Sequence, residues 1–122
     1  MQLVHIKNTN ARSSTNTITL GSSGLIAFSV AASEMLQLEK GVKLMFLQDK
    51  DRPKDWYLNI SDDGDSCPRK YKDNMFCFNA SGLARTIKKS LDADEKKSLK
   101  IALGEPFDNE GQTLIALLTA KI

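Results

Sequence analysis

The chain contains few histidines and cysteines, the side chains that bind zinc and, for cysteine, form disulfide bonds. Its 122 residues include one histidine, His5, and two cysteines, Cys67 and Cys77, which do not form a C-x-x-C pair. One imidazole and two separated thiols do not make a convincing zinc site. We therefore expect no metal and two reduced thiols, as is usual in the cytoplasm. A disulfide bond stays open as an alternative, because the two cysteines could lie on paired strands of one hairpin.

Long apolar runs are also absent. Hydrophobic residues make up 41% of the chain, which suffices for a core, but no run approaches the roughly 18 residues of a membrane-spanning helix. The first residues, MQLVHIKN, do not combine a charged leader with an apolar block, as a signal peptide does. We expect a cytoplasmic protein that does not bind membranes.

The charge balance is close to neutral. The chain has 17 basic and 15 acidic residues, for a formal net charge of +2. Residues 1–61 carry 7 basic and 5 acidic side chains, and residues 62–122 carry 10 of each. A protein that relies on phosphate contacts is usually more basic than this. Any nucleic-acid-binding surface must therefore be a local patch.

Motifs of catalysis and cofactor binding are missing. The sequence has neither a P-loop nor a G-x-G-x-x-G motif, and Cys77 has no cation close in sequence that would activate its thiol. The acidic segment 61–66 (SDDGDS) lacks the regular ladder and the distal glutamate of a calcium loop. We expect a protein that is not an enzyme and holds no cofactor, with residues 61–66 as a connecting loop.

The first half of the chain predicts two strands, a helix and two further strands. We expect strands over residues 17–20, 25–28, 42–48 and 56–60, and a helix over residues 30–38. Residues 39–41 end this helix, and Gly41 suits the left-handed turn at a helix end. Residues 21–24 (GSSG) suit a tight turn between the first two strands. Ser29 stands where its hydroxyl can cap the helix. Residues 42–48 are largely apolar, which favours a central strand.

The second half repeats this order. We expect strands over residues 67–72, 75–78, 98–103 and 113–119, a helix over residues 80–91, and a loop over residues 104–111. Pro68 restricts the first strand to an edge, or itself to the start of the strand. Asp73-Asn74 forms the turn, and Asn79 is the expected helix cap. Residues 24–29 (GLIAFS) align without gaps with residues 74–79 (NMFCFN). Each segment is a turn residue, an apolar strand that ends in phenylalanine, and a capping residue.

The repeat predicts the fold. One ββαβ(β) unit leaves open edges and an apolar face that a second unit must cover. We expect a mostly β protein with two short helices (α+β), a single domain over residues 1–122 built of pseudo-repeats at about 13–61 and 67–120. The hairpins would interlock into a swapped-hairpin or double-psi-like barrel. The alternative is a chance similarity between two ordinary ββαβ runs.

The first copy resembles the AbrB-like swapped-hairpin family of bacterial transition-state regulators and antitoxins. The family pattern G-R-I-x-I-P, helix, L-G-L-x-x-G-D corresponds here to residues 24–29 (GLIAFS) and 36–42 (LQLEKGV). The resemblance covers about a third of the chain. It implies the barrel, which family members complete by dimerising, and a role in DNA binding. The DNA-contacting arginine after the glycine is replaced by Leu25 and, in the second copy, by Met75. The arginine early in the helix aligns with Ser33.

Basic residues concentrate in the second half. The candidate nucleic-acid-binding residues are Arg69, Lys70, Lys72, Arg85, Lys88, Lys89, Lys96 and Lys97, with Lys100 nearby and Tyr71 as a stacking group. We expect Arg85, Lys88 and Lys89 on the helix face opposite the apolar stripe. This face either tracks a phosphate backbone or is simply solvated. The sequence therefore predicts a small DNA-binding transcription regulator, or alternatively a protein-interaction or structural module, as a monomer or homodimer.

Overall fold

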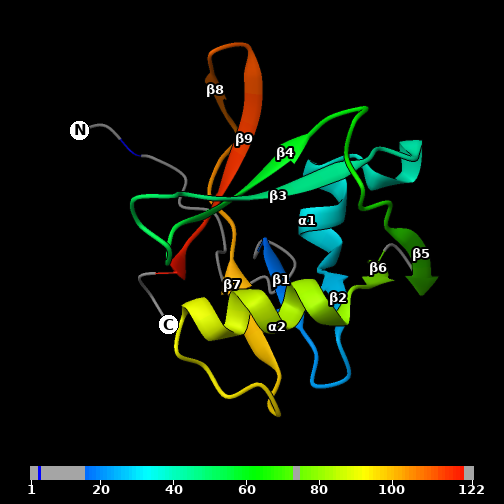
Figure 1. Ribbon diagram of the computed structural model, residues 1–122. Helices are drawn as coiled ribbons and strands as arrows, with labels where there is room; N and C mark the ends of the chain where they lie inside the picture. The colour runs from blue at the N-terminus through cyan, green and yellow to red at the C-terminus, as the bar shows by residue number, and fades with distance from the viewer. Residues whose placement is uncertain (1–2, 4–15, 73–74, 120–122) are drawn as a thin grey trace.

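Two antiparallel sheets and two helices form the body of the protein (Figure 1). This computed structural model describes residue 3, residues 16–72 and residues 75–119. The elements are, in chain order, β1 (Thr17–Leu20), β2 (Leu25–Phe28), α1 (Val30–Met35), the 3₁₀ helix η2 (Leu38–Lys40), β3 (Leu44–Gln48), β4 (Trp56–Ile60), β5 (Arg69–Lys72), β6 (Met75–Asn79), α2 (Ser81–Ser90), β7 (Leu99–Ala102), β8 (Phe107–Asn109) and β9 (Gln112–Leu117). The predicted mostly β, α+β class is confirmed.

The larger sheet joins the two halves of the chain. Its strand order is β5-β6-β2-β1-β7, so the hairpins β1–β2 and β5–β6 meet through β2 and β6. Within this pair, Ile26 is in register with Phe78, and Phe28 with Phe76. The smaller sheet has the order β3-β4-β9-β8, in which β4 and β9 form the contact between the halves.

The two sheets meet at isolated bridges and do not form one closed barrel among the described strands. Leu44 bridges to Ser66, just before β5, and Leu103 bridges to Leu117 at the ends of β7 and β9. Both bridges are single residue pairs, so the ladder is interrupted at each junction. The expected continuous barrel is therefore wrong for the described chain, which instead contains two sheets packed on a shared core.

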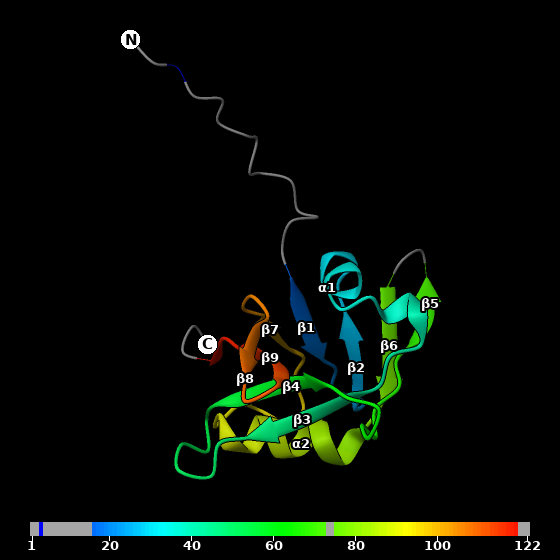
Figure 2. The same cartoon turned by 90° about the horizontal axis from the view of Figure 1, so that it is seen from above.

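The core lies between these sheets and the helices. Strand residues alternate, so that Ile18, Leu20, Ile26 and Phe28 are fully buried while Thr19, Leu25 and Ala27 are partly exposed. Leu58 and Ile115 of the smaller sheet belong to the same cluster. Helices α1 and α2 lie on opposite sides of this body (Figures 1 and 2).

Several local predictions are confirmed. The Ser29 hydroxyl caps α1 by accepting a hydrogen bond from the Ala32 amide at 3.2 Å. Gly41 adopts the left-handed conformation with φ of 75°. The strand expected at residues 56–60 is β4. Pro68 lies just before β5, which is an edge strand, so both positions that the sequence allowed for this proline are consistent with the structure. His5 and the turn at residues 73–74 lie outside the described residues.

Other local predictions are wrong. Strand β3 is an edge strand, and its apolar character arises because Phe46 packs on Phe78 of the other sheet, with ring centroids 6.3 Å apart. Asn79 is not a helix cap, because it is still paired with Leu25 in β6. Residues 104–111 contain β8, and the helix expected over 30–38 stops at Met35.

Candidate nucleic-acid interface

A hollow lies between the turn that connects β1 to β2 and one side of α2. We call it the turn–helix pocket. It has a volume of about 240 Å³ and is lined by Gly21, Ser22, Ser23, Gly24, Ser81, Ala84, Arg85, Lys88, Glu95 and Lys96. Three of the predicted cations, Arg85, Lys88 and Lys96, therefore lie next to this turn. The role predicted for the turn is only structural.

The turn docks on the start of α2 because residue 24 has no side chain. Gly24 has φ of +95°, and a Cβ atom there would lie 2.5 Å from the Cβ of Ser81. The Gly24 carbonyl accepts a hydrogen bond from the Ala80 amide at 3.0 Å. Glycine thus allows both the left-handed conformation and the close approach of the helix.

Lys88 is buried, contrary to the predicted exposed position. Only 2% of the residue is accessible, because it follows Ala84 by one helical turn and shares its inward face. Its ammonium group donates hydrogen bonds to the carbonyl oxygens of Gly21 (3.1 Å) and Glu95 (3.2 Å). Lys88 therefore ties the turn, the helix and the following loop together at the base of the pocket.

Arg85 and Lys96 are exposed where they line the pocket. Only two ion pairs link described side chains, Lys54–Asp92 at 3.5 Å and Lys89–Glu95 at 3.9 Å. Neither pair includes Arg85 or Lys96, so both cations face solvent without a carboxylate partner in the described part of the chain. A hydrogen bond within the loop helps to hold Lys96 in place: the Lys96 backbone amide donates to the Asp94 carboxylate at 2.9 Å.

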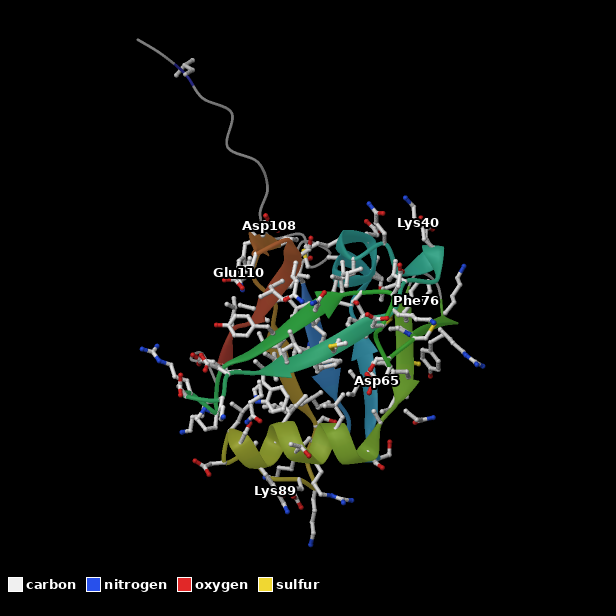
Figure 3. All side chains as sticks on the ribbon, turned by 45° about the horizontal axis from the view of Figure 1, so that its top comes forward. Lys40, Asp65, Phe76, Lys89, Asp108 and Glu110 are labelled. Atoms are coloured by element: carbon white, nitrogen blue, oxygen red, sulfur yellow. The ribbon has the colours of Figure 1, made fainter. Side chains whose placement is uncertain are left out.

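The other predicted cations around α2 point to solvent. Lys89 projects outward from the helix (Figure 3) and pairs with Glu95. Lys97 and Lys100 are exposed on the chain that follows α2. These three side chains fit the prediction of a solvated face, and none of them lines the turn–helix pocket.

A second group of predicted residues lies on β5, which we call the β5 surface. Arg69, Lys70 and Tyr71 are exposed on this edge strand, and Tyr71 is 65% accessible. They line a separate hollow of about 390 Å³ together with Leu25, Cys67, Cys77, Phe78 and Asn79. The side chain of Lys72 lies outside the described residues. The other seven predicted cations thus divide between two hollows and a solvated face.

Both cysteines are free thiols. Cys67 is exposed and Cys77 is partly buried, and both line the hollow next to the β5 surface. The strand register places Arg69, not Cys67, opposite Cys77. No disulfide bond joins Cys67 and Cys77 in the described part of the chain.

Sequence reasoning missed the serine-rich turn as part of the site. The residues are visible as GSSG, but their proximity to Arg85 and Lys88 depends on long-range contacts. Among the described residues, no group of three or more histidine, cysteine, aspartate or glutamate side chains is placed to hold a metal. No helix in the described ranges is long and apolar enough to cross a membrane.

Comparison with known proteins adds no relative. No protein-family model matches the chain, and neither a curated protein nor a solved structure matches it.

Proposed function

We propose that this chain is a small, non-enzymatic DNA-binding module that acts as a transcription regulator in the cytoplasm. One observation carries the proposal: Arg85 and Lys96, both exposed and outside any ion pair among the described residues, converge on the turn–helix pocket. Cations that are not neutralised by carboxylates are available to replace the counterions of a phosphate backbone.

The β5 surface supports the same function. Arg69 and Lys70 stand beside the exposed ring of Tyr71, a combination that suits a phosphate backbone and an unstacked base. Phosphate contacts position a protein on DNA without reading its sequence. The proposed module therefore binds DNA with little base preference from these residues alone.

The proposed architecture is an internally duplicated, AbrB-like swapped hairpin. An offset of 50 residues carries the pair Thr19–Ala27 of β1–β2 onto the pair Arg69–Cys77 of β5–β6. The same offset relates the pair Ile26–Phe78 to the pair Phe28–Phe76 within the β2–β6 ladder. These matching registers support a duplication over a chance similarity, and a duplicated chain can act as a monomer without a partner.

A salt titration tests DNA binding. Fluorescence anisotropy of a labelled duplex should give a log K that falls linearly with log[salt], by about 0.9 per phosphate contact. Replacing both Arg85 and Lys96 by alanine removes up to two phosphate contacts. The slope of log K against log[salt] should become less steep by the amount expected for up to about two contacts. The matched control is Lys50→Ala with Arg52→Ala, one lysine and one arginine on the exposed β3–β4 loop.

Absence of binding at low salt would refute the proposed function. A salt slope that the Arg85 and Lys96 substitutions leave unchanged would refute the assignment of the contact to the turn–helix pocket. A loss of affinity in the control variant as large as in the test variant would show that net charge alone matters.

A second candidate function is protein interaction through the β8–β9 hairpin. This hairpin projects from the body (Figure 1), and all three residues of the edge strand β8 are exposed. Phe107 is 43% accessible and packs edge-on against Tyr57, with centroids 6.2 Å apart. An open strand edge with an aromatic side chain suits addition of a partner strand. A stoichiometric partner that is lost on Phe107→Asp would favour this candidate.

A further inference from the structure

We infer that the turn–helix pocket is a specific site for one phosphoryl group, with the Lys88 ammonium at its base. The inference deepens the proposed function and rests on it for the source of the phosphate, a DNA backbone. The same chemistry would also recognise a free phosphate or a phosphate monoester.

The first argument is the charge of Lys88. Its side chain is buried, and its two hydrogen-bond partners are backbone carbonyls, which carry no formal charge. Neither ion pair among the described residues includes it. A buried ammonium without a counterion is costly. It has three N–H donors, so after the two carbonyls one donor is left for an anion in the pocket that Lys88 lines.

The second argument is the convergence of donors from three segments. Arg85 on α2 supplies a planar guanidinium that can bind a phosphate with two hydrogen bonds. Lys96 adds an exposed ammonium, and the hydroxyls of Ser22, Ser23 and Ser81 add neutral donors. A tetrahedral oxyanion, with acceptors pointing in several directions, uses such a set better than a planar carboxylate does.

The N-terminal end of α2 also favours the binding of an anion in the pocket. Ser81, which lines the pocket, is the first residue of this ten-residue helix. The cap residue Ala80 provides no side-chain acceptor, and the first turn contains no acidic residue. The partial positive charge of the helix terminus is therefore not neutralised locally and favours an anion.

Glu95 is the one acidic residue at the pocket. Its carboxylate lies 3.9 Å from the Lys89 ammonium, and its backbone carbonyl, not its carboxylate, accepts from Lys88. Glu95 therefore leaves the buried ammonium unneutralised.

The size of the pocket limits the ligand. Its volume of about 240 Å³ is below the roughly 300–1,000 Å³ of pockets that enclose drug-sized ligands. A phosphate group fits inside, whereas a nucleoside attached to it would extend into solvent. The site therefore recognises the phosphoryl group and not the base.

The site occurs once in the chain. The 50-residue offset between the halves places Met35 and Leu38 of the first half at the positions of Arg85 and Lys88. The first half cannot supply these cations, so we expect one phosphate per chain.

Binding of inorganic phosphate tests the inference directly. The full chain, labelled with ¹⁵N, is titrated with sodium phosphate against sodium chloride at equal ionic strength. We expect saturable shifts of the amide signals of Ser22, Ser23, Ser81 and Arg85, with one phosphate per chain. Replacing Arg85 and Lys96 by alanine should weaken binding at least tenfold, whereas the Lys50→Ala, Arg52→Ala control should not change it.

Lys88→Met keeps the length of the side chain and removes its charge, and it should also weaken phosphate binding at least tenfold. If this variant does not fold, the variant with both Arg85 and Lys96 replaced by alanine still tests the phosphate site, because both substitutions are at exposed residues. Phosphate shifts that do not saturate, or equal affinity in the wild type and this variant, would overturn the inference.

Competition identifies the source of the phosphate. If phosphate displaces a labelled duplex more strongly than chloride at equal ionic strength, both the site and the proposed function are supported. If phosphate binds saturably while DNA does not bind, the proposed function fails and the site stands as one for a free phosphate or monoester. DNA binding without localised phosphate binding leaves the function standing and refutes the site.

Discussion

Ala27 and Cys77 are paired in register across β2 and β6, at the point where the two hairpins meet. The neighbouring pairs Ile26–Phe78 and Phe28–Phe76 continue the same antiparallel register. The hairpins β1–β2 and β5–β6, one from each half of the chain, therefore meet inside the larger sheet.

This register predicts a new disulfide bond. Directly paired residues on antiparallel strands have Cβ atoms about 4.5–5.5 Å apart, close to the roughly 3.5–4.5 Å of a disulfide. We expect Ala27→Cys, in a Cys67→Ser background, to form an intramolecular bond with Cys77 under mild oxidation. Mass spectrometry of the peptides and loss of free thiols measure it.

Thr19→Cys in the same background is the matched control. Thr19 pairs with Ala27 from the other side and is separated from Cys77 by β2. It should remain a free thiol. Equal cross-linking at positions 19 and 27 would contradict the strand order β6-β2-β1.

Features governed by neighbouring residues can be predicted from the sequence. The hydroxyl of Ser29, the β-branched start of β1 and the left-handed Gly41 act within a few residues of their own positions, and each prediction about them is confirmed. The similarity of residues 24–29 to residues 74–79 is also visible in the sequence, although Asn79 pairs with Leu25 in β6 and does not cap α2. These signals suffice for the class and for most strands.

Features governed by distant contacts cannot be predicted in this way. The helical spacing from Ala84 already places Lys88 on the inward face, so its predicted outward position is a misreading of the period, but the sequence does not show that the carbonyls of Gly21 and Glu95 accept from its ammonium group. The apolar character of β3 favours the centre of a sheet, whereas Phe46 is covered by the other sheet. The pocket needs a turn from one half and a helix from the other, which a linear pattern does not reveal.

Gly24 should tolerate alanine much less well than other glycines with positive φ. Gly24→Ala combines a left-handed conformation with a Cβ atom 2.5 Å from the Cβ of Ser81. Gly111 has φ of +85°, but the space that a Cβ atom would occupy there is open, so Gly111→Ala carries the conformational strain alone. We expect Gly24→Ala to lower the free energy of unfolding by about 1–3 kcal/mol more than Gly111→Ala. Urea denaturation of both variants measures the difference, and equal losses would contradict the close packing of the turn on α2.

The single tryptophan reports on the contact between the smaller sheet and α2. The Trp56 indole donates a hydrogen bond to the Ser90 hydroxyl at 2.8 Å, and that hydroxyl donates to the Ile87 carbonyl at 2.7 Å. Because Trp56 is 4% accessible, Ser90→Ala leaves a buried donor without its partner. We expect a loss of about 1–3 kcal/mol in the free energy of unfolding and a shifted tryptophan emission.

Thr86→Ala provides the control on the same helix. Its hydroxyl donates to the Gly82 carbonyl at 2.8 Å, but the residue is exposed. Water can replace this hydrogen bond, so we expect a change within about 0.5 kcal/mol and an unchanged emission spectrum. A Ser90→Ala variant as stable as Thr86→Ala would show that the indole finds another partner.

Substitution of Tyr71 distinguishes two ways in which the β5 surface can contact nucleic acid: stacking on an unstacked base, and contact with a duplex. Its ring is 65% accessible between the cations of an edge strand, and stacking on a base is worth about 1–3 kcal/mol, but only where the base is unstacked. We therefore expect Tyr71→Ala to weaken binding of a single-stranded oligonucleotide about tenfold and to change duplex binding little. Phe107→Ala removes an exposed ring from the opposite sheet and should affect neither. Anisotropy titrations with the two labelled substrates measure this, and equal losses for both substrates would mean that Tyr71 contributes packing to β5 and not a stacking contact.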